Sequence, residues 1–272
     1  MSADTVLTDL LVSVRDLVDG MPIHARVSAR PLADNETPVI FVPGLGLSVC
    51  YLEPTMTHLA REHVVAGLDL PGFGRSGTPP AALDVDGLCT ALVSWLDVRG
   101  LGPAIFVGHS FGCQVIVELA TRAPTRVRGL LLSAPTMDPA YRTVGQQLMC
   151  MLADIPYEPW TLGFIGVRDY VRAGPRRILA TLRHALADRI EDKLPAIVAP
   201  VLVVCGACDP VVTVDWGTRV TKLVGRSALG AAGAVMSVVP GAAHALPYDE
   251  PALFATLTTK LVERARTVSR AR

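Results

Sequence analysis

The chain has 272 residues, of which 50% are hydrophobic and 18% are charged. This length and composition predict a soluble globular protein that can build one large core. Its 25 basic and 25 acidic side chains give a formal net charge of zero. We therefore expect no nucleic-acid or membrane partner, and we expect a small-molecule substrate that is neutral or apolar.

The predicted compartment is the cytoplasm. Residues Met1 to Asp4 lack the basic stretch and apolar core of a secretion signal, and no apolar run reaches membrane-spanning length.

Six cysteines in a chain this long predict reduced, mostly buried thiols. Cys205 and Cys208 have C-x-x-C spacing, but no second pair or suitably spaced histidines accompany them, so we expect no metal site. The oligomeric state stays open.

Short apolar runs alternate with amphipathic segments along most of the chain. The predicted strands are residues 10–15, 23–28, 39–42, 64–68, 104–107, 128–133, 201–204 and 235–239. The predicted helices are residues 52–62, 85–99, 111–123, 215–224 and 251–266. This alternation predicts an α/β fold with a mostly parallel eight-stranded sheet, helices on both faces and antiparallel first strands. Active residues are then expected at the carboxyl ends of the strands.

Residues Gly108 to Gly112 form a G-x-S-x-G sequence between a predicted strand and a predicted helix. A serine at such a turn is held on a sharp, strained corner, and the flanking glycines let the two backbones pass close to it. Ser110 is therefore a candidate nucleophile. Taken alone, the motif also fits a Gly-rich turn with a capping serine. His109 is expected to be a packing residue, because neighbours on a tight turn point apart.

A serine hydroxyl needs a base to take its proton and a carboxylate to orient that base. Both are present downstream. Asp209 ends an apolar run, and His244 follows a strand and a turn. Asp209 could instead cap the segment that follows it, and Asp138 or Asp249 could orient the histidine. The strand-end placement favours Asp209 as the acid.

The motifs G-x-S-x-G, G-x-x-D-P and G-x-x-H occur in the order serine, aspartate, histidine. On these motifs the chain resembles the α/β-hydrolase family over nearly its whole length. The resemblance implies a catalytic triad of Ser110, Asp209 and His244. It also implies an oxyanion hole formed by the backbone N–H groups of Leu45 and Phe111.

The alternation of strands and helices stops between residues 136 and 194. The resemblance implies that this segment, inserted after the sixth strand, forms a helical cap (136–194) over a core made of residues 1–135 and 195–272. Methionine and aromatic side chains in the cap predict an adaptable apolar pocket wall. The expected substrate-binding residues are Met149, Met151, Trp160 and Phe164. The alternative for each of them is ordinary packing against the core.

The leading hypothesis is a serine hydrolase that cleaves an ester, thioester, lactone or related acyl bond of a small, mainly apolar substrate, without a metal or organic cofactor. Relatives with the same triad include C–C bond hydrolases, perhydrolases, cofactor-free dioxygenases and receptor-like proteins with slow hydrolysis, which remain alternatives. A further hypothesis is that residues Gly44 to Gly46 form a dinucleotide-binding loop, with Asp69 binding the ribose. The sequence disfavours it, because Val49 stands where the third glycine of the G-x-G-x-x-G motif would be, and because the hypothesis leaves the triad residues without a role.

Overall fold

The structure, a computed structural model, describes residues 10–33, 36–224 and 233–270. Its strands form one sheet in the order β1-β2-β4-β3-β5-β6-β7-β8. The strands are β1 (Leu11–Val18), β2 (Met21–Ser28), β3 (Val39–Val42), β4 (Val65–Leu68), β5 (Ala104–His109), β6 (Val127–Ser133), β7 (Val201–Gly206) and β8 (Ala234–Val239).

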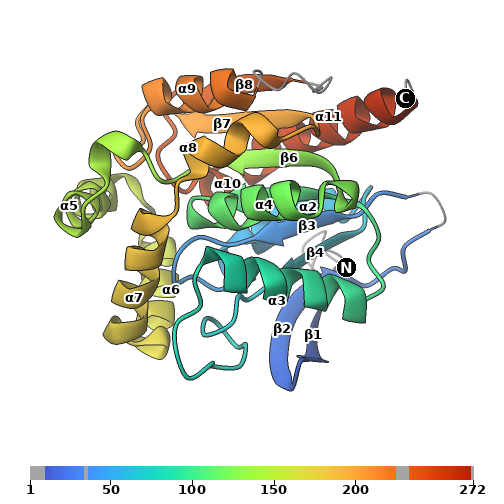
Figure 1. Ribbon diagram of the computed structural model, residues 1–272, viewed down its shortest axis with the longest axis horizontal. Helices are drawn as coiled ribbons and strands as arrows, with labels where there is room; N and C mark the ends of the chain where they lie inside the picture. The colour runs from blue at the N-terminus through green and yellow to red at the C-terminus, as the bar shows by residue number, and fades with distance from the viewer. Residues whose placement is uncertain (1–9, 34–35, 225–232, 271–272) are drawn as a thin grey trace, which may run out of the picture.

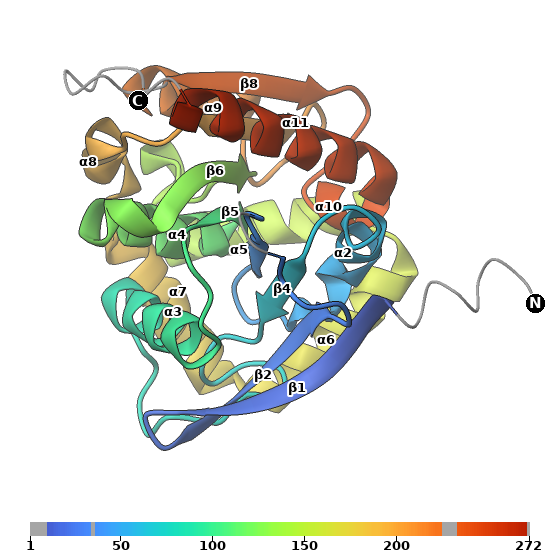
Figure 2. The same cartoon turned by 90° about the vertical axis from the view of Figure 1, so that its right-hand side faces the viewer.

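The sheet is mostly parallel, as predicted. Strand β1 pairs antiparallel with β2, and β2 pairs antiparallel with β4, whereas the remaining neighbours are parallel. Figure 2 shows β1 and β2 as a long curved ribbon at one edge of the sheet. The parallel strands therefore end along one edge, where loops from several of them can form a site.

Helices cover both faces of the sheet (Figure 1). The helices that flank it are α2 (Glu53–Leu59), α3 (Val85–Val98), α4 (Phe111–Arg122), α8 (Ile190–Lys193), α9 (Val214–Val224), α10 (Leu246–Asp249) and α11 (Pro251–Arg270). One core cluster joins α3, α4 and α9 to one face, and a second joins α2 and α11 to the other. Alternate strand residues supply the two clusters: Ile40 faces the first and Phe41 the second. None of the described helices combines the length and apolar character needed to cross a bilayer.

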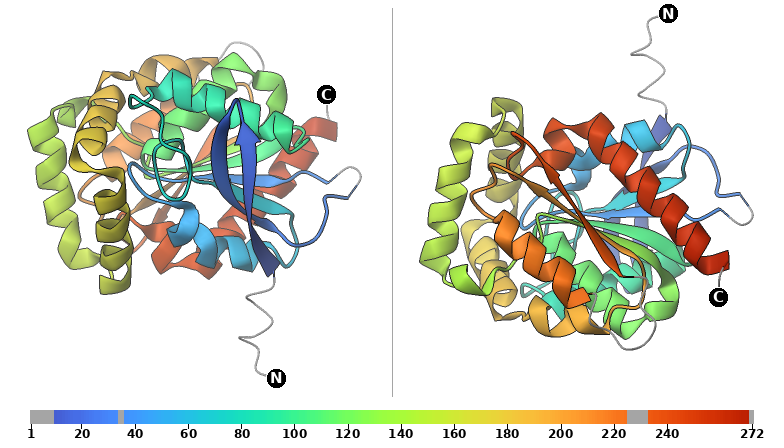
Figure 3. Two further views of the ribbon diagram at one scale, coloured as in Figure 1. Left: turned by 90° about the horizontal axis from the view of Figure 1, so that it is seen from below. Right: turned by 90° about the horizontal axis from the view of Figure 1, so that it is seen from above.

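Three further helices lie between β6 and β7. They are α5 (Val144–Asp154), α6 (Trp160–Ala173) and α7 (Pro175–Ala187), and a 3-10 helix, η5 (Ile155–Tyr157), joins the first two. We call residues 136–187, which contain them, the insertion. Figure 3 shows these helices together at one end of the molecule. Ala185 of α7 and Ile190 of the following helix α8 both belong to the core cluster that includes α4.

The turn from β5 into α4 is sharply bent at Ser110, where φ is 53° and ψ is −119°. The flanking glycines are needed because the backbones touch. A Cβ on Gly112 would lie 2.2 Å from the carbonyl oxygen of Val42, and one on Gly108 would lie 2.8 Å from the amide nitrogen of Cys113. The strained corner predicted from the motif is therefore confirmed.

The contact at Gly112 predicts a large effect of a single methyl group. Gly112→Ala should lower the free energy of unfolding by about 1–3 kcal/mol or more, because the new Cβ meets backbone that has no room to move. Urea unfolding measures this change. Gly145→Ala is the matched control, since that glycine lies in α5 with open space around it, and this variant should gain up to about 1 kcal/mol. Equal stabilities of the two variants would contradict close packing at the turn.

Candidate active site

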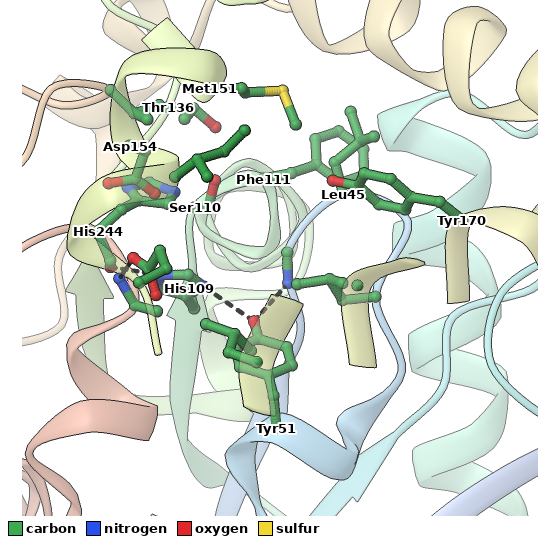
Figure 4. Close-up of a pocket in the computed structure, with 18 of the residues that line it drawn as sticks. Leu45, Tyr51, His109, Ser110, Phe111, Thr136, Met151, Asp154, Tyr170 and His244 are labelled. Carbon is green, nitrogen blue, oxygen red and sulfur yellow. Dashed lines mark hydrogen bonds between the residues drawn. The ribbon is translucent and has the colours of Figure 1, made fainter. Parts of the chain in front are cut away.

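A cavity of about 330 Å³ lies where the carboxyl ends of the strands meet the insertion. Ser110 and His244 both line it, together with mainly apolar side chains from the insertion and from the loop after β3. Figure 4 shows His244 beside Ser110, with Leu45 and Tyr170 across the cavity from them. The two residues expected to act as nucleophile and base therefore face one enclosed space.

Asp209, which follows β7, holds the imidazole of His244, which follows β8. Nδ1 of His244 donates a hydrogen bond to Oδ2 of Asp209 at 2.9 Å. The other oxygen, Oδ1, accepts hydrogen bonds from the backbone N–H groups of Val211 (2.7 Å) and Val212 (2.9 Å). One carboxylate thus caps the following turn and orients the histidine, so both sequence-based interpretations of Asp209 hold. The bond at Nδ1 leaves Nε2 available for proton transfer.

The other candidate acids make different contacts. Asp138 accepts a hydrogen bond from the backbone N–H of Ala140 at 2.9 Å and begins the short 3-10 helix η4 (Pro139–Tyr141). Asp249 ends α10, and burial together with the charge of Asp154 raises its pKa to about 6. The carboxylate that orients His244 is therefore that of Asp209.

His109 was predicted only to pack against its neighbours, but it also makes two hydrogen bonds that link separate segments of the site. The backbone N–H of Gly44 donates to the hydroxyl oxygen of Tyr51 at 2.8 Å, and that hydroxyl lies 2.8 Å from Nδ1 of His109. Nε2 of His109 lies 2.9 Å from the carbonyl oxygen of His244. Burial and the charge of His244 lower the pKa of His109 to about 3, so its ring is neutral. A neutral ring protonated at Nε2 satisfies every contact: Tyr51 donates to Nδ1, and Nε2–H donates to the carbonyl.

The two expected oxyanion donors come from neighbouring segments, the start of α4 and the loop after β3. Phe111 is the first residue of α4, so its N–H has no partner within the helix and lies at the positive end of the helix dipole. Leu45 follows Gly44 in the loop after β3. Both residues line the cavity together with Ser110, and their role as oxyanion donors stays a prediction.

Two contacts join the insertion to the loop after β3. Asp169 of α6 is fully buried and accepts hydrogen bonds from the N–H (2.8 Å) and hydroxyl (2.5 Å) of Ser48. Gly46 has φ +80°, and a Cβ on it would lie 2.6 Å from atoms of Tyr170 and Ile178. The insertion therefore packs directly against the segment that carries Leu45.

The four substrate-binding residues expected in the cap divide into two pairs. Met151 and Trp160 line the cavity, whereas Met149 and Phe164 are not part of its wall and are 66% and 70% exposed. The expectation for Met149 and Phe164 is thus corrected. Consecutive helical residues are about 100° apart, so Met149 and Met151 point in widely different directions from α5.

A pair of carboxyl groups from the insertion lies in the cavity wall next to His244. Asp154 ends α5, and Glu158 follows η5; Oε1 of Glu158 accepts a hydrogen bond from the N–H of Ala245 at 3.0 Å. Burial and the charge of Asp154 raise the pKa of Glu158 to about 8, so Glu158 is mostly protonated at neutral pH. Burial also raises the pKa of Asp154. Sharing one proton lets both groups remain buried.

These carboxyl groups change the titration of His244. Burial alone opposes protonation of its ring, but Asp209, Asp154 and Glu158 outweigh burial and raise the pKa of His244 to about 9. In Asp209 burial also favours the neutral form, yet His244 and two backbone N–H groups lower the pKa of the carboxyl below its usual value. The pair is therefore an imidazolium and a carboxylate at neutral pH when the cavity is empty.

The remaining polar groups singled out by the sequence have structural partners. Asp69 is fully buried. Its oxygens accept hydrogen bonds from Nδ1 of His24 (2.8 Å) and from the backbone N–H groups of Val49 (2.7 Å) and Arg75 (2.7 Å). The carboxylate is therefore not accessible to a ribose. The cysteines are free thiols. Across the described residues, no three His, Cys, Asp or Glu side chains are grouped to hold a metal ion.

Comparison with known proteins identifies the family. A sequence profile of the alpha/beta hydrolase family matches residues 39–257. The chain belongs to this family. Its sheet, covered by helices on both faces, and the turn at Ser110 agree with membership of this family.

Several relatives of this alpha/beta hydrolase are known. The human (lyso)-N-acylphosphatidylethanolamine lipase is 27% identical over 177 residues, which are 61% of this chain and 52% of that protein. A membrane phospholipase A has a similar structure, with a TM-score of 0.79, 20% identity and coverage of 97% and 90% of the two chains. An enol-lactonase from Burkholderia xenovorans LB400 has a TM-score of 0.76, 20% identity and coverage of 92% and 100%. The matched segments span 28 to 52% of the first curated relatives' own lengths.

Three residues of this hydrolase site were missed in the sequence. Tyr51 is 58 residues from its partner His109, and no local pattern marks that pairing. Asp154 and Glu158 do have a signal, because two acids four residues apart interrupt an otherwise apolar segment. Acids in such a segment indicate buried and therefore perturbed carboxyl groups.

The raised pKa of His244 predicts an alkaline pH profile. Only the neutral imidazole can take a proton from serine, so kcat/KM should rise with pH and level off above a pKa of about 9. Asp154→Asn removes a carboxylate that favours the imidazolium, so the rise should move to lower pH. Asp215→Asn is the control, since it removes an exposed carboxylate on α9. An unchanged profile in Asp154→Asn would contradict the electrostatic role of the pair.

The Tyr51 hydroxyl predicts a loss that affects turnover more than substrate binding. Tyr51→Phe leaves the buried N–H of Gly44 without an acceptor and Nδ1 of His109 without a donor, at a cost of about 1–3 kcal/mol. We expect kcat to fall by roughly tenfold to a hundredfold with little change in KM, because the loop carrying Leu45 is less fixed. Steady-state kinetics tests this. Tyr248→Phe is the matched control: it also removes a tyrosine hydroxyl, one bonded to Thr161, and Tyr248 is not part of the cavity wall.

Proposed function

We propose that this alpha/beta hydrolase is a serine hydrolase that cleaves an ester, thioester, lactone or related acyl bond of a small, mainly apolar substrate. The observation that carries the proposal is the bond from His244 to Asp209 at the wall of the cavity that also holds the strained Ser110. Most of the remaining wall is apolar. A cavity of about 330 Å³ is at the lower end of the size range of small-molecule sites.

The proposed first half-reaction begins at Ser110. Its hydroxyl oxygen attacks the carbonyl carbon of the substrate while Nε2 of His244 takes the hydroxyl proton. The N–H groups of Leu45 and Phe111 bind the negative charge that develops on the carbonyl oxygen. The bond to the leaving group then breaks, His244 gives its proton to that group, and an acyl-enzyme remains.

Water completes the cycle. It attacks the acyl carbon as Nε2 of His244 accepts one of its protons, and the ester bond to Ser110 breaks. His244 returns the proton to the serine oxygen, and the carboxylic acid leaves. Asp209 stabilises the imidazolium in both halves and keeps its Nδ1 protonated. These steps need no metal or organic cofactor.

The insertion is proposed to act as a cap over this reaction. Met151 and Trp160 line the cavity from α5 and α6, and Leu182 lines it from α7. Such a wall takes up acyl chains by removing their surface from water, at about 0.8 kcal/mol for each methylene group. The lipase and lactonase named above act on acyl bonds, which supports the same substrate class for this chain.

The triad predicts strongly non-additive losses. Ser110→Ala and His244→Ala should each lower kcat by as much as roughly 10⁶-fold, and the double variant should be little worse, because the two side chains act as one unit. Asp209→Asn should lower kcat by about 10⁴-fold through the wrong histidine tautomer. Hydrolysis of a panel of esters, thioesters and lactones measures these losses.

Two controls accompany the triad variants. Asp138→Asn changes another buried aspartate and should retain activity near that of the wild type. A fluorophosphonate should label Ser110 in the wild type and in Asp138→Asn, as read by peptide mass spectrometry. Labelling of a different serine, or independent multiplicative losses, would overturn the proposed mechanism.

A further inference from the structure

The insertion holds most of the exposed large hydrophobic side chains of this protein. Of 19 such side chains among the residues that the structure describes, 12 lie between Tyr141 and Leu179. We define the insertion face as six of them: Leu152 on α5, Ile155 at the start of η5, and Trp160, Phe164, Val167 and Val171 on α6. Apolar side chains gathered in this way mark an interaction surface rather than ordinary solvent exposure.

The α6 part of this face is a continuous stripe. Its members follow one another at intervals of four, three and four residues, which places them on one side of a helix. Trp160 is 83% exposed and Val171 is 77% exposed. The opposite side of α6 is anchored by buried Leu162 and Asp169. The helix is therefore fixed to the protein by one side and presents an unpartnered apolar side.

Charge distinguishes this region from the rest of the chain. The whole chain has a formal net charge of zero, but α6 and α7 together carry five arginines and one acidic residue, the buried Asp169. Arg168 pairs with Asp169, and Arg172 and Arg177 donate hydrogen bonds to backbone carbonyl groups between residues 74 and 81, whereas Arg176 and Arg183 are exposed. An apolar stripe beside a cluster of arginines is the composition of helices that lie in the interface of an anionic bilayer.

The insertion face is continuous with the mouth of the cavity. Ile155 and Trp160 line the cavity and are also 62% and 83% exposed. A flat partner seated on this face would therefore lie next to the opening that leads to Ser110. Tryptophan at the rim suits such a position, because its ring is favoured at the boundary between lipid and water.

We propose that the insertion face docks on the surface of an anionic lipid bilayer, with the stripe of α6 in contact with acyl chains and with Arg176 and Arg183 beside lipid headgroups. Docking of this kind needs no membrane-spanning helix. This proposal differs from the expectation that the chain has no membrane partner, which was based on its net charge of zero. A net charge of zero does not describe how the basic residues are distributed over the surface, and here they are distributed unevenly.

A second copy of the chain is the competing occupant. A symmetric dimer through this face would bring two α6–α7 arginine clusters together without acidic residues of these helices to neutralise them. An anionic bilayer supplies the opposite charge. The charge distribution therefore favours the bilayer.

The test uses the tryptophan fluorescence of the whole 272-residue chain. Trp95 and Trp216 are 0% and 1% exposed, so a change on lipid binding reports Trp160. Vesicles of phosphatidylcholine alone are compared with vesicles of equal parts phosphatidylcholine and phosphatidylglycerol. We expect a blue shift and co-sedimentation with the anionic vesicles, weakened by salt. Because binding is measured without turnover, the result is independent of the proposed reaction.

Paired variants locate the surface. Val167→Glu with Val171→Glu should lower the partition coefficient by tenfold or more; neither residue is part of the cavity wall. Leu17→Glu with Val98→Glu, which adds the same charge at exposed apolar positions on β1 and α3, should have little effect. Arg176→Ala with Arg183→Ala should lower binding to anionic vesicles about tenfold or more, whereas Arg61→Ala with Lys222→Ala should change it little.

Three outcomes would overturn the proposal. The first is an unchanged emission spectrum and no co-sedimentation with either vesicle. The second is equal loss of binding in the insertion-face variants and in their controls. The third is a dimer in sedimentation velocity that Val167→Glu with Val171→Glu dissociates, which would assign the face to a second copy of the chain.

Discussion

The structure depends on one close backbone contact, between the start of α4 and the end of β3. Gly112 has no side chain, so α4 can approach the carbonyl oxygen of Val42, and the chain can turn at Ser110 with a positive φ. This approach places the first N–H of the helix beside the loop that carries Leu45. The serine, the helix dipole and the second loop therefore converge because two strands and a helix pack at minimal distance.

A chain of buried hydrogen bonds then couples the parts that surround the serine. It runs from the loop after β3, through Tyr51 and His109, to the backbone of His244. His109 is next to Ser110 in the chain. The loop after β3 and the segment that carries His244 are therefore both hydrogen-bonded, through His109, to the turn at Ser110. Such a network is stable only when every donor and acceptor is satisfied, and burial keeps water from competing for them.

The sequence predicted the parts of this molecule that local chemistry determines. Alternating apolar runs indicated the strands, and G-x-S-x-G indicated the turn at Ser110, because glycine spacing and hydrophobic period act over a few residues. Met149 and Phe164 were wrong as wall residues because the phase of each helix relative to the cavity is decided by tertiary packing. The role of His109 was also missed, since it depends on Tyr51 from a distant segment. The effect of the carboxyl pair of Asp154 and Glu158 on His244 became interpretable only once all three residues were found in one cavity wall.

The packing at Gly46 bears on how such proteins diverge. Tyr170 and Ile178 occupy the space that a side chain at position 46 would need, and Ser48 is bonded to Asp169. The insertion and the loop after β3 therefore constrain each other's sequence. A chimaera that received this insertion would also need glycine at position 46. A protein with a larger residue at position 46 would need different side chains in place of Tyr170 and Ile178.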